Sequence, residues 1–136
     1  MKAKTVFLTL LLLAASSMLR AQSLEGTWKA IESSGNPVRE NYTHLKYITT
    51  THFIWTMSDK DGNIISGAGG TYTLVDGVYT ETILYTLPGM KNWKGKSARY
   101  EVKVEGKKMT VTGYLEYNSE KKVENTESWE KIDGVV

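Results

Sequence analysis

The feature that most restricts the fold of this chain is a two-residue alternation of apolar and polar side chains, which recurs in short runs after residue 22. The run from residue 97 to residue 104 shows it most clearly, because apolar residues alternate there with Arg99, Glu101 and Lys103. A strand with one buried face has this period, whereas a helix repeats every 3.6 residues. We find no convincing helical period after residue 22, so the chain is expected to fold from β-strands.

Turn sequences separate these runs from one another. Asp76-Gly77 is a two-residue hairpin signal, because Gly accepts a positive φ. The polar stretch at residues 58–63 is a second strong turn, and residues 38–43 are ambiguous and could hold a short helical turn. The expected strands cover residues 27–32, 45–50, 52–57, 71–75, 78–85, 97–104, 109–117 and 123–132.

The short connections determine how such strands can be arranged. A parallel sheet needs a crossover of a dozen or more residues between strands, and there is no room for one here. An antiparallel meander has two exposed edges unless it closes on itself. We therefore predict an all-β fold, a single antiparallel up-and-down barrel of about eight to ten strands. A sandwich would also fit, but Greek-key connections are longer than most of those present.

The first 21 residues are typical of a secretory signal peptide rather than of a folded domain. Lys2 and Lys4 precede a nearly continuous apolar run from Val6 to Ala15, and small residues follow. Cleavage is expected near Ala21, with Ala15 and Ser17 as alternatives, which leaves residues 22–136 as the barrel domain. The run is shorter than the roughly 20 residues of a membrane span, so no stable membrane insertion is expected. An uncleaved anchor is the alternative to an exported protein that is periplasmic or secreted.

Composition excludes several classes of function. The precursor has a formal net charge of +2, and removal of the basic residues Lys2, Lys4 and Arg20, with no acidic residue, lowers it to −1. Such a balance does not indicate a nucleic-acid partner, which would require a clustered basic face. The chain has no cysteine. A disulfide framework, a thiolate metal centre and a cysteine nucleophile are therefore excluded.

Three groups of motifs occur in a recognisable order. Gly26-Thr27-Trp28 opens the first strand, and Glu127-Ser128-Trp129-Glu130-Lys131-Ile132 closes the last. Between them stand Asp59-Lys60-Asp61-Gly62, Gly69-Gly70-Thr71-Tyr72 and Tyr79-Thr80-Glu81. Over residues 24–132 the chain resembles the lipocalins and their calycin relatives, and in particular the small lipocalin-like domains secreted by Gram-negative bacteria, a family of unknown function.

The resemblance implies a structural role for residues at both ends of the chain. In lipocalins the Trp of Gly-x-Trp closes the base of the barrel, which here would be Trp28, and the Gly, here Gly26, lets the chain enter tightly. A basic residue of the last strand packs over that Trp, a role that Lys131 could fill. Trp129 shares a face with Lys131 and is expected to point inward.

The aromatic residues of the middle strands are candidates for lining a ligand pocket. In a small barrel the inward side chains either fill the interior or surround a cavity. A pocket would be lined by aromatic rings whose hydroxyl groups orient a ligand. Ordinary core packing is an equal alternative. Our choices for lining residues are Phe53, Trp55, Tyr72, Tyr85 and Tyr100.

The longest break in the strand pattern, residues 86–96, is the best candidate for a portal. It places Trp93 among Lys91, Lys94 and Lys96. An exposed Trp there could cap the barrel mouth, and the lysines could attract an acidic ligand such as a fatty acid. The alternative is that Trp93 folds back onto the barrel and that the lysines are solvated.

Glu81 alternates with Tyr79, Ile83 and Tyr85, so its orientation depends on which face is inside. If that face is the inner one, Glu81 is a buried carboxyl that needs a hydrogen-bond partner. A tyrosine hydroxyl, Arg99 or a histidine could serve. The other register leaves Glu81 in water. We favour the inward register.

The sequence shows no catalytic or metal-binding constellation. No nucleophile–base pair and no suitably spaced pair of carboxylates is visible, so we do not expect an enzyme. His44 and His52 lack nearby acidic ligands and are expected to be solvated or hydrogen-bonded, and no metal or other cofactor is expected. Residues 59–63 lack the ligand spacing of a calcium loop.

Two functions from different classes remain open. The first is an exported binding protein that holds a small apolar or amphipathic molecule in the barrel. The second is a structural or interaction module with a filled interior, which contacts an envelope protein or a glycan through its loops. An enclosed pocket of about 300 Å³ or more, lined by Trp55, Tyr85 and Tyr100, would favour the first function, and a solid interior would contradict it.

Overall fold

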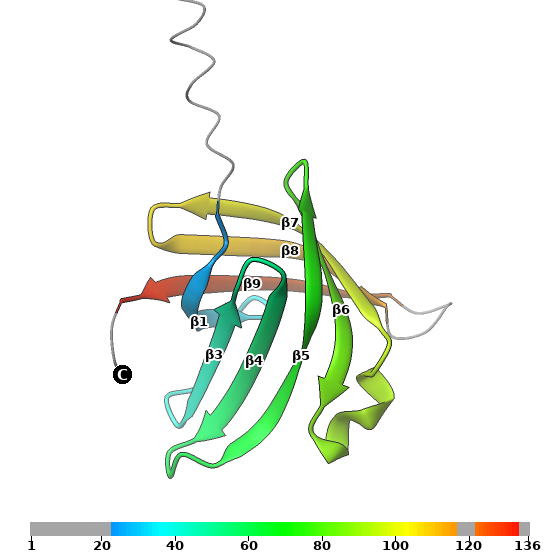
Figure 1. The fold of residues 1–136 in the computed structure, drawn as a ribbon. Helices are drawn as coiled ribbons and strands as arrows, with labels where there is room; N and C mark the ends of the chain where they lie inside the picture. Colours follow the sequence, from blue (N-terminus) through cyan, green and yellow to red (C-terminus); the bar gives the residue numbers. More distant parts are fainter. Residues whose placement is uncertain (1–22, 117–121, 134–136) are drawn as a thin grey trace, which may run out of the picture.

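The computed structural model describes residues 23–116 and 122–133 (Figure 1). The predicted signal peptide, residues 1–21, lies outside the described residues. The described part contains strands and one short 3-10 helix, named η1, in this order: β1 Gly26–Ser33, β2 Asn36–Pro37, β3 Tyr42–Ile48, β4 His52–Asp59, β5 Ile64–Val75, β6 Val78–Thr86, η1 Pro88–Trp93, β7 Ser97–Glu105, β8 Lys108–Glu116 and β9 Lys122–Ile132.

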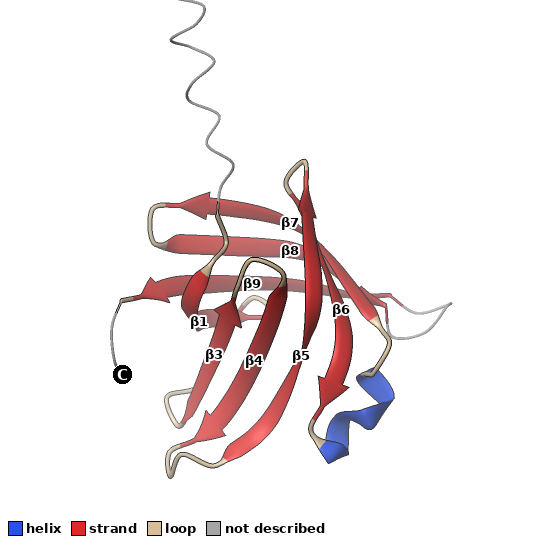
Figure 2. Cartoon of the chain, in the orientation of Figure 1, coloured by secondary structure: helices blue, strands red, loops and turns tan. Residues whose placement is uncertain are grey.

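The strands close into a barrel because β1 pairs with both β3 and β9. The remaining strands pair in sequence order from β3 to β9, and every pairing is antiparallel. The short strand β2 pairs only with the end of β1 and adds one strand to the closed set of eight. In Figure 2 the strands are red, and η1 is the blue helix that connects β6 to β7. The predicted all-β, antiparallel up-and-down barrel is confirmed.

No helix within residues 23–116 and 122–133 combines the length and the apolar character needed to cross a membrane.

The hairpin between β5 and β6 turns where the sequence predicts it. Asp76 and Gly77 both have positive φ, 51° and 76°, as a tight hairpin turn requires. Strand β5 is longer than the predicted strand at residues 71–75, because it begins at Ile64 and includes Gly67–Gly70. A Cβ at Gly70 would lie 1.9 Å from the carbonyl oxygen of Thr82. Only glycine allows this close approach of β5 and β6.

A bulge in β6 explains which side chains point inward. Gly69 pairs with Tyr85 and Gly70 with Ile83, so Leu84 is an extra residue opposite them. Before the bulge, alternate residues face the interior, and the predicted inward register of Glu81 is correct. Past the bulge the alternation is inverted. Tyr85 is therefore 44% exposed and lies on the outer face, which corrects the expectation that it lines the interior.

The base of the barrel is packed solid around Trp28. This side chain is fully buried, and its Nε1–H donates to the carbonyl oxygen of Leu24 at 2.8 Å. The Nζ atom of Lys131 lies 5.4 Å from the centroid of the Trp28 ring. Gly26 has a φ of 133°, and a Cβ there would lie 2.6 Å from Cε of Lys131. The Lys131 side chain thus lies against the backbone of Gly26 and over the Trp28 ring, as the resemblance implied.

Candidate functional site

The interior of the barrel is not completely filled. A cavity of about 220 Å³ lies at the end of the barrel where β1 ends, β3 begins and η1 is located. It is smaller than the pocket of about 300 Å³ expected of a binding protein, and its lining includes Trp55 and Tyr100 but not Tyr85. Trp93, the last residue of η1, contributes to its wall, as do side chains from strands all round the barrel. The lining residues are Ser33, His44, Lys46, Trp55, Met57, Ser66, Glu81, Ile83, Trp93, Ala98, Tyr100, Leu115, Asn125, Glu127 and Trp129.

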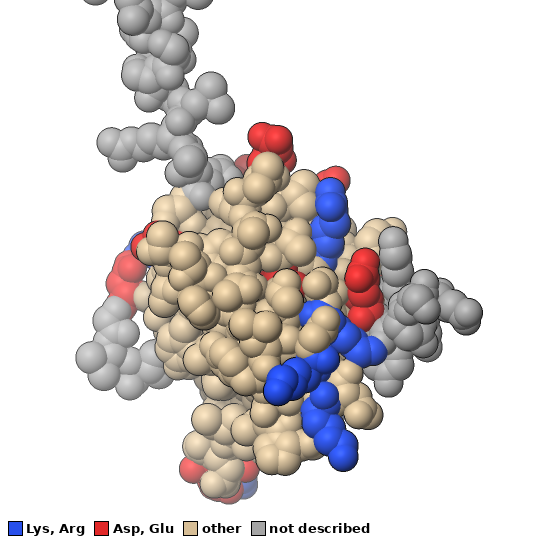
Figure 3. All heavy atoms as spheres, turned by 45° about the vertical axis from the view of Figure 1, so that its right-hand side comes forward, with Lys and Arg blue, Asp and Glu red and all other residues tan. Residues whose placement is uncertain are grey.

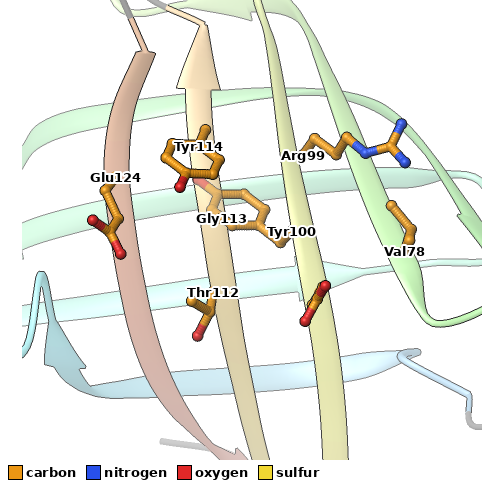
Figure 4. A pocket seen from close by; sticks show the side chains of 8 residues that line it. Val78, Arg99, Tyr100, Thr112, Gly113, Tyr114 and Glu124 are labelled. Carbon is orange, nitrogen blue, oxygen red and sulfur yellow. The ribbon is translucent and has the colours of Figure 1, made fainter.

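A second hollow of about 330 Å³ lies on the outside of the barrel, across β6 to β9 (Figure 4). Its charged side chains, Arg99, Glu101 and Glu124, are all exposed. In Figure 4, Arg99 extends toward Val78 and away from Tyr114. Charges in open water interact weakly, so this larger hollow has few means of selecting a ligand. The smaller interior cavity is the better candidate, because its polar groups are desolvated.

A buried ion pair forms one side of the cavity. Lys46 Nζ donates to Oε1 of Glu81 at 2.7 Å, and both side chains are almost completely buried. The Tyr79 hydroxyl donates to the same oxygen at 2.7 Å. Burial by itself would lower the pKa of the Lys46 ammonium, but its attraction to Glu81, and further to Glu127, raises that pKa above its ordinary value. Lys46 is therefore a firmly protonated ammonium rather than a nucleophile.

A second carboxyl group, that of Glu127, is held by neutral donors. Asn125 Nδ2 donates to its Oε1 at 2.8 Å, and Trp129 Nε1 donates to its Oε2 at 2.9 Å. The Trp129 ring is also in contact with the ion pair, since Lys46 Nζ lies 4.9 Å from its centroid. Lys46 thus lies close to two carboxyl groups and to an aromatic ring.

His44 packs between two tryptophans on the cavity wall. Its ring lies edge-on to Trp55 and to Trp129, with centroid distances of 5.4 Å and 4.7 Å. The residue is only 7% exposed, and its Nδ1 has no hydrogen-bond partner in the described structure. Burial, reinforced by Lys46, lowers the pKa of His44 to about 4. The ring is therefore neutral at pH 7. Of the two states expected for a histidine, solvated or hydrogen-bonded, the solvated one is wrong for His44.

The lowered pKa of His44 predicts a loss of stability in mild acid. The unfolded chain takes up this proton near pH 6.5, whereas the folded chain does so only near pH 4. Stability is therefore fully present above pH 6.5 and falls as the pH drops toward 4, by about 3 kcal/mol from this group. Urea unfolding at several pH values, compared between the natural chain and His44→Gln, measures the contribution.

His52 provides the control for that experiment. It is exposed and pairs through Nδ1 with the Thr51 hydroxyl at 2.7 Å. Because the His52 side chain is exposed, we expect His52→Gln to change the free energy of unfolding little at pH 7. An equal slope between pH 4 and pH 6.5 for His44→Gln and the natural chain would show that His44 is not buried as described.

The structure brings together four of the residues proposed from the sequence. Trp55, Glu81, Trp93 and Tyr100 all line the interior cavity. Trp93 is partly buried and packs against the core, so it is folded back onto the barrel as in the alternative described above. The loop that carries it forms η1.

The other proposed lining residues lie elsewhere. Phe53 is 1% exposed and belongs to the packed core. Tyr72 packs with its ring centroid 5.1 Å from that of Tyr79, and its hydroxyl donates to the carbonyl oxygen of Thr49 at 2.7 Å. Tyr85 is on the outer face. Of the hydrogen-bond partners proposed for Glu81, the tyrosine hydroxyl is present, as Tyr79, whereas Arg99 is exposed. Lys46, which was not proposed, is the second partner.

Sequence reasoning missed Lys46, Asn125 and Glu127. A signal for Lys46 was present, because it shares the period-two face of β3 with His44 and Ile48. Glu127 stands two residues before Trp129 in β9 and so shares its inward face.

The described residues contain no group of three or more histidine and acidic side chains placed to hold a metal ion.

Comparison with known proteins gives the family of the chain. A family model described as a domain of unknown function, DUF4488, matches residues 23–135. The chain belongs to the DUF4488 family. The match spans the whole described barrel of this DUF4488 domain, from β1 to β9.

A solved structure shows the same fold as this DUF4488 domain. It is the crystal structure of an uncharacterized protein from Bacteroides eggerthii, with 16% sequence identity and a TM-score of 0.56. The similarity covers 81% of this chain and all of the other. At this identity the likeness concerns the fold alone. No curated protein matches the DUF4488 sequence.

Proposed function

We propose that this chain is an exported, lipocalin-like binding protein that holds a small molecule in its interior cavity and performs no chemical step on it. The observation that carries the proposal is the cavity of about 220 Å³ whose lining includes Trp55, Trp93 and Trp129, together with buried polar groups on its wall. Aromatic walls with a few oriented polar groups are typical of small-molecule sites. Export is supported by the signal-like pattern of residues 1–21.

The volume and the polarity of the cavity restrict the size and the chemical class of the ligand. Sites for drug-sized molecules usually occupy about 300–1,000 Å³, so this cavity suits a smaller molecule. An ion pair and a further carboxyl group on the wall disfavour a purely apolar chain, because a ligand without polar groups would leave them poorly solvated. The ligand we propose is therefore compact and amphipathic rather than a long-chain fatty acid.

A fragment screen by thermal unfolding tests this function. A ligand that binds only the folded state stabilises it by about 2.7 kcal/mol at 100 times its Kd, which raises Tm measurably. Ser66 lies on the cavity wall, and Ser66→Phe places a ring inside the cavity. Thr112→Phe adds the same ring at an exposed position in the outer hollow. We expect compact fragments that raise Tm in the natural chain and in Thr112→Phe but not in Ser66→Phe. Hits lost only in Thr112→Phe, or no hits at all, would contradict the proposal.

The interaction module is the second candidate, and an apolar strip on the outer face favours it. Tyr47 lies opposite Ile54, Ile54 opposite Gly69, and Gly69 opposite Tyr85 across four strands. The three side chains are 42–44% exposed. If this strip binds an envelope protein, a photo-crosslinker at position 85 captures one specific protein in the exporting cell and a crosslinker at position 112 does not.

A further inference from the structure

The charged groups around the interior cavity are unequal in number. Its wall carries one ammonium group, that of Lys46, and two carboxyl groups, those of Glu81 and Glu127. His44 adds no charge at neutral pH, because its pKa lies near 4. The formal balance inside the cavity is thus one negative charge in excess.

The unbalanced negative charge is that of the Glu127 carboxylate. Glu81 has an ion-pair partner at hydrogen-bond distance, whereas both donors to Glu127, Asn125 and Trp129, are neutral. Glu127 is near enough to attract the Lys46 ammonium, but that ammonium donates its hydrogen bond to Glu81. A carboxylate whose hydrogen-bond donors are both neutral attracts a further cation, and a partly desolvated site strengthens that attraction.

The cavity walls also suit a cation. Trp55, Trp93, Tyr100 and Trp129 contribute aromatic surface, and a cation over an aromatic face is stabilised by the negative face of the ring. Lys46 Nζ already lies 4.9 Å from the centroid of Trp129 and 5.7 Å from that of Tyr79. The same kind of contact is open to a ligand between these walls.

His44 is an independent observation that points to a polar ligand at the wall. It is a buried polar side chain that lines the cavity, and its Nδ1 has no partner in the described structure. Buried polar groups without partners are uncommon in folded proteins. A neutral imidazole has one acceptor nitrogen, to which an N–H group of a ligand could donate.

From these observations we infer that the cavity binds a small organic cation, a protonated amine on a compact apolar body. The ammonium group lies toward Glu127, and the apolar body packs between the tryptophans. The inference rests on the proposed function, since it names the class of ligand for the same cavity.

The lysines near η1 do not oppose this assignment. Figure 3 shows Lys and Arg side chains gathered toward one side of a largely uncharged face. Lys91 and Lys94 are exposed. A given pair of charges interacts about four times more weakly in water than at the effective dielectric near 20 of a protein site, and salt screens it further. The exposed lysines therefore affect the rate of encounter more than the affinity, which the buried groups determine.

Three ligands of nearly equal size test the charge preference. Benzylamine is mainly protonated at pH 7, benzyl alcohol is neutral and benzoate is anionic, and all three carry one phenyl ring. We expect calorimetric titration to show a Kd for benzylamine at least tenfold lower than for benzyl alcohol, with benzoate weakest. This comparison uses the natural chain and depends on no variant.

Glu127→Gln tests the assigned position of the ammonium group. Gln keeps an acceptor oxygen for Trp129 or Asn125 but removes the charge. We expect benzylamine to lose about tenfold in affinity and benzyl alcohol to change little. The control is Glu130→Gln, an exposed acid in the same strand, which should change neither.

The outcomes separate this inference from the proposed function. If benzyl alcohol or benzoate binds the cavity as tightly as benzylamine, or if Glu127→Gln leaves benzylamine unaffected, the cation assignment is wrong and a binding function stands. If none of the three ligands binds and the fragment screen finds no cavity ligand, both are wrong.

Discussion

Replacement of Trp28 by Ala should destabilise the protein by about 3–5 kcal/mol, the range for large-to-small changes of buried aromatic residues. Trp28 is fully buried at the base of the barrel, where its ring packs beneath Lys131 and its indole N–H donates to Leu24. The substitution removes both contacts and leaves a cavity that the closed strands around it cannot fill. Chemical unfolding followed by circular dichroism measures the loss.

Two further variants make the Trp28 experiment specific. Trp28→Phe keeps most of the volume but leaves the carbonyl of Leu24 without its donor, so it should cost less than the alanine variant. Tyr114→Ala removes an aromatic ring that is 49% exposed and should change stability by no more than about 0.5 kcal/mol. A loss below about 1 kcal/mol for Trp28→Ala would show that the residue does not close the base of the barrel.

Breaking the buried ion pair should have an effect of similar size. Glu81→Leu leaves the Lys46 ammonium desolvated without its partner, and such losses are typically about 3–5 kcal/mol. Replacing both residues, in Lys46→Met with Glu81→Leu, should recover most of that stability, because well-packed apolar residues often replace a buried pair without loss. A double-mutant cycle from denaturant unfolding gives the coupling between the two residues.

The solvent-exposed pair Lys103–Glu105 is the matched control. Its side chains are about 70% exposed, so Glu105→Gln should change stability little.

The pH dependence of the stabilisation by the buried Lys46–Glu81 pair follows from the direction of the Lys46 pKa shift. Because the folded state raises the pKa of Lys46, the stabilisation is complete at neutral pH and is lost only as the pH rises above the ordinary range of lysine. A double variant no more stable than Glu81→Leu would show that the buried charge is not the cause.

The fold could be predicted from the sequence because the patterns that specify it are local in the chain. A period of two decides strand over helix, and short connections decide antiparallel pairing. The turn at Asp76-Gly77 follows from the backbone freedom of two neighbouring residues, and it forms as predicted. The base contact between Trp28 and Lys131 came from a motif at each end of the chain, which a closed barrel brings together.

The sequence predicted only part of the candidate site, and the residues that it placed wrongly have structural causes. Tyr85 was expected inside because it continues the alternation of Tyr79 and Glu81. A single extra residue, Leu84, inverts that alternation, and the bulge arises from the close pairing of β6 with glycines of β5. Such an irregularity depends on the neighbouring strand, so periodicity within β6 cannot show it.

By itself the sequence predicted a closed antiparallel barrel, from the spacing within strands and the turns between them. The resemblance to lipocalins placed Trp28 at its base, and the alternation of β6 left two registers for Glu81, of which we favoured the inward one. Only the tertiary structure decided which charges meet inside. Lys46 and Glu81 are 35 positions apart, and Glu127 comes from the last strand. Their contact depends on barrel closure, which brings strands remote in sequence around one cavity, and that cavity with its charge balance carries the proposed function.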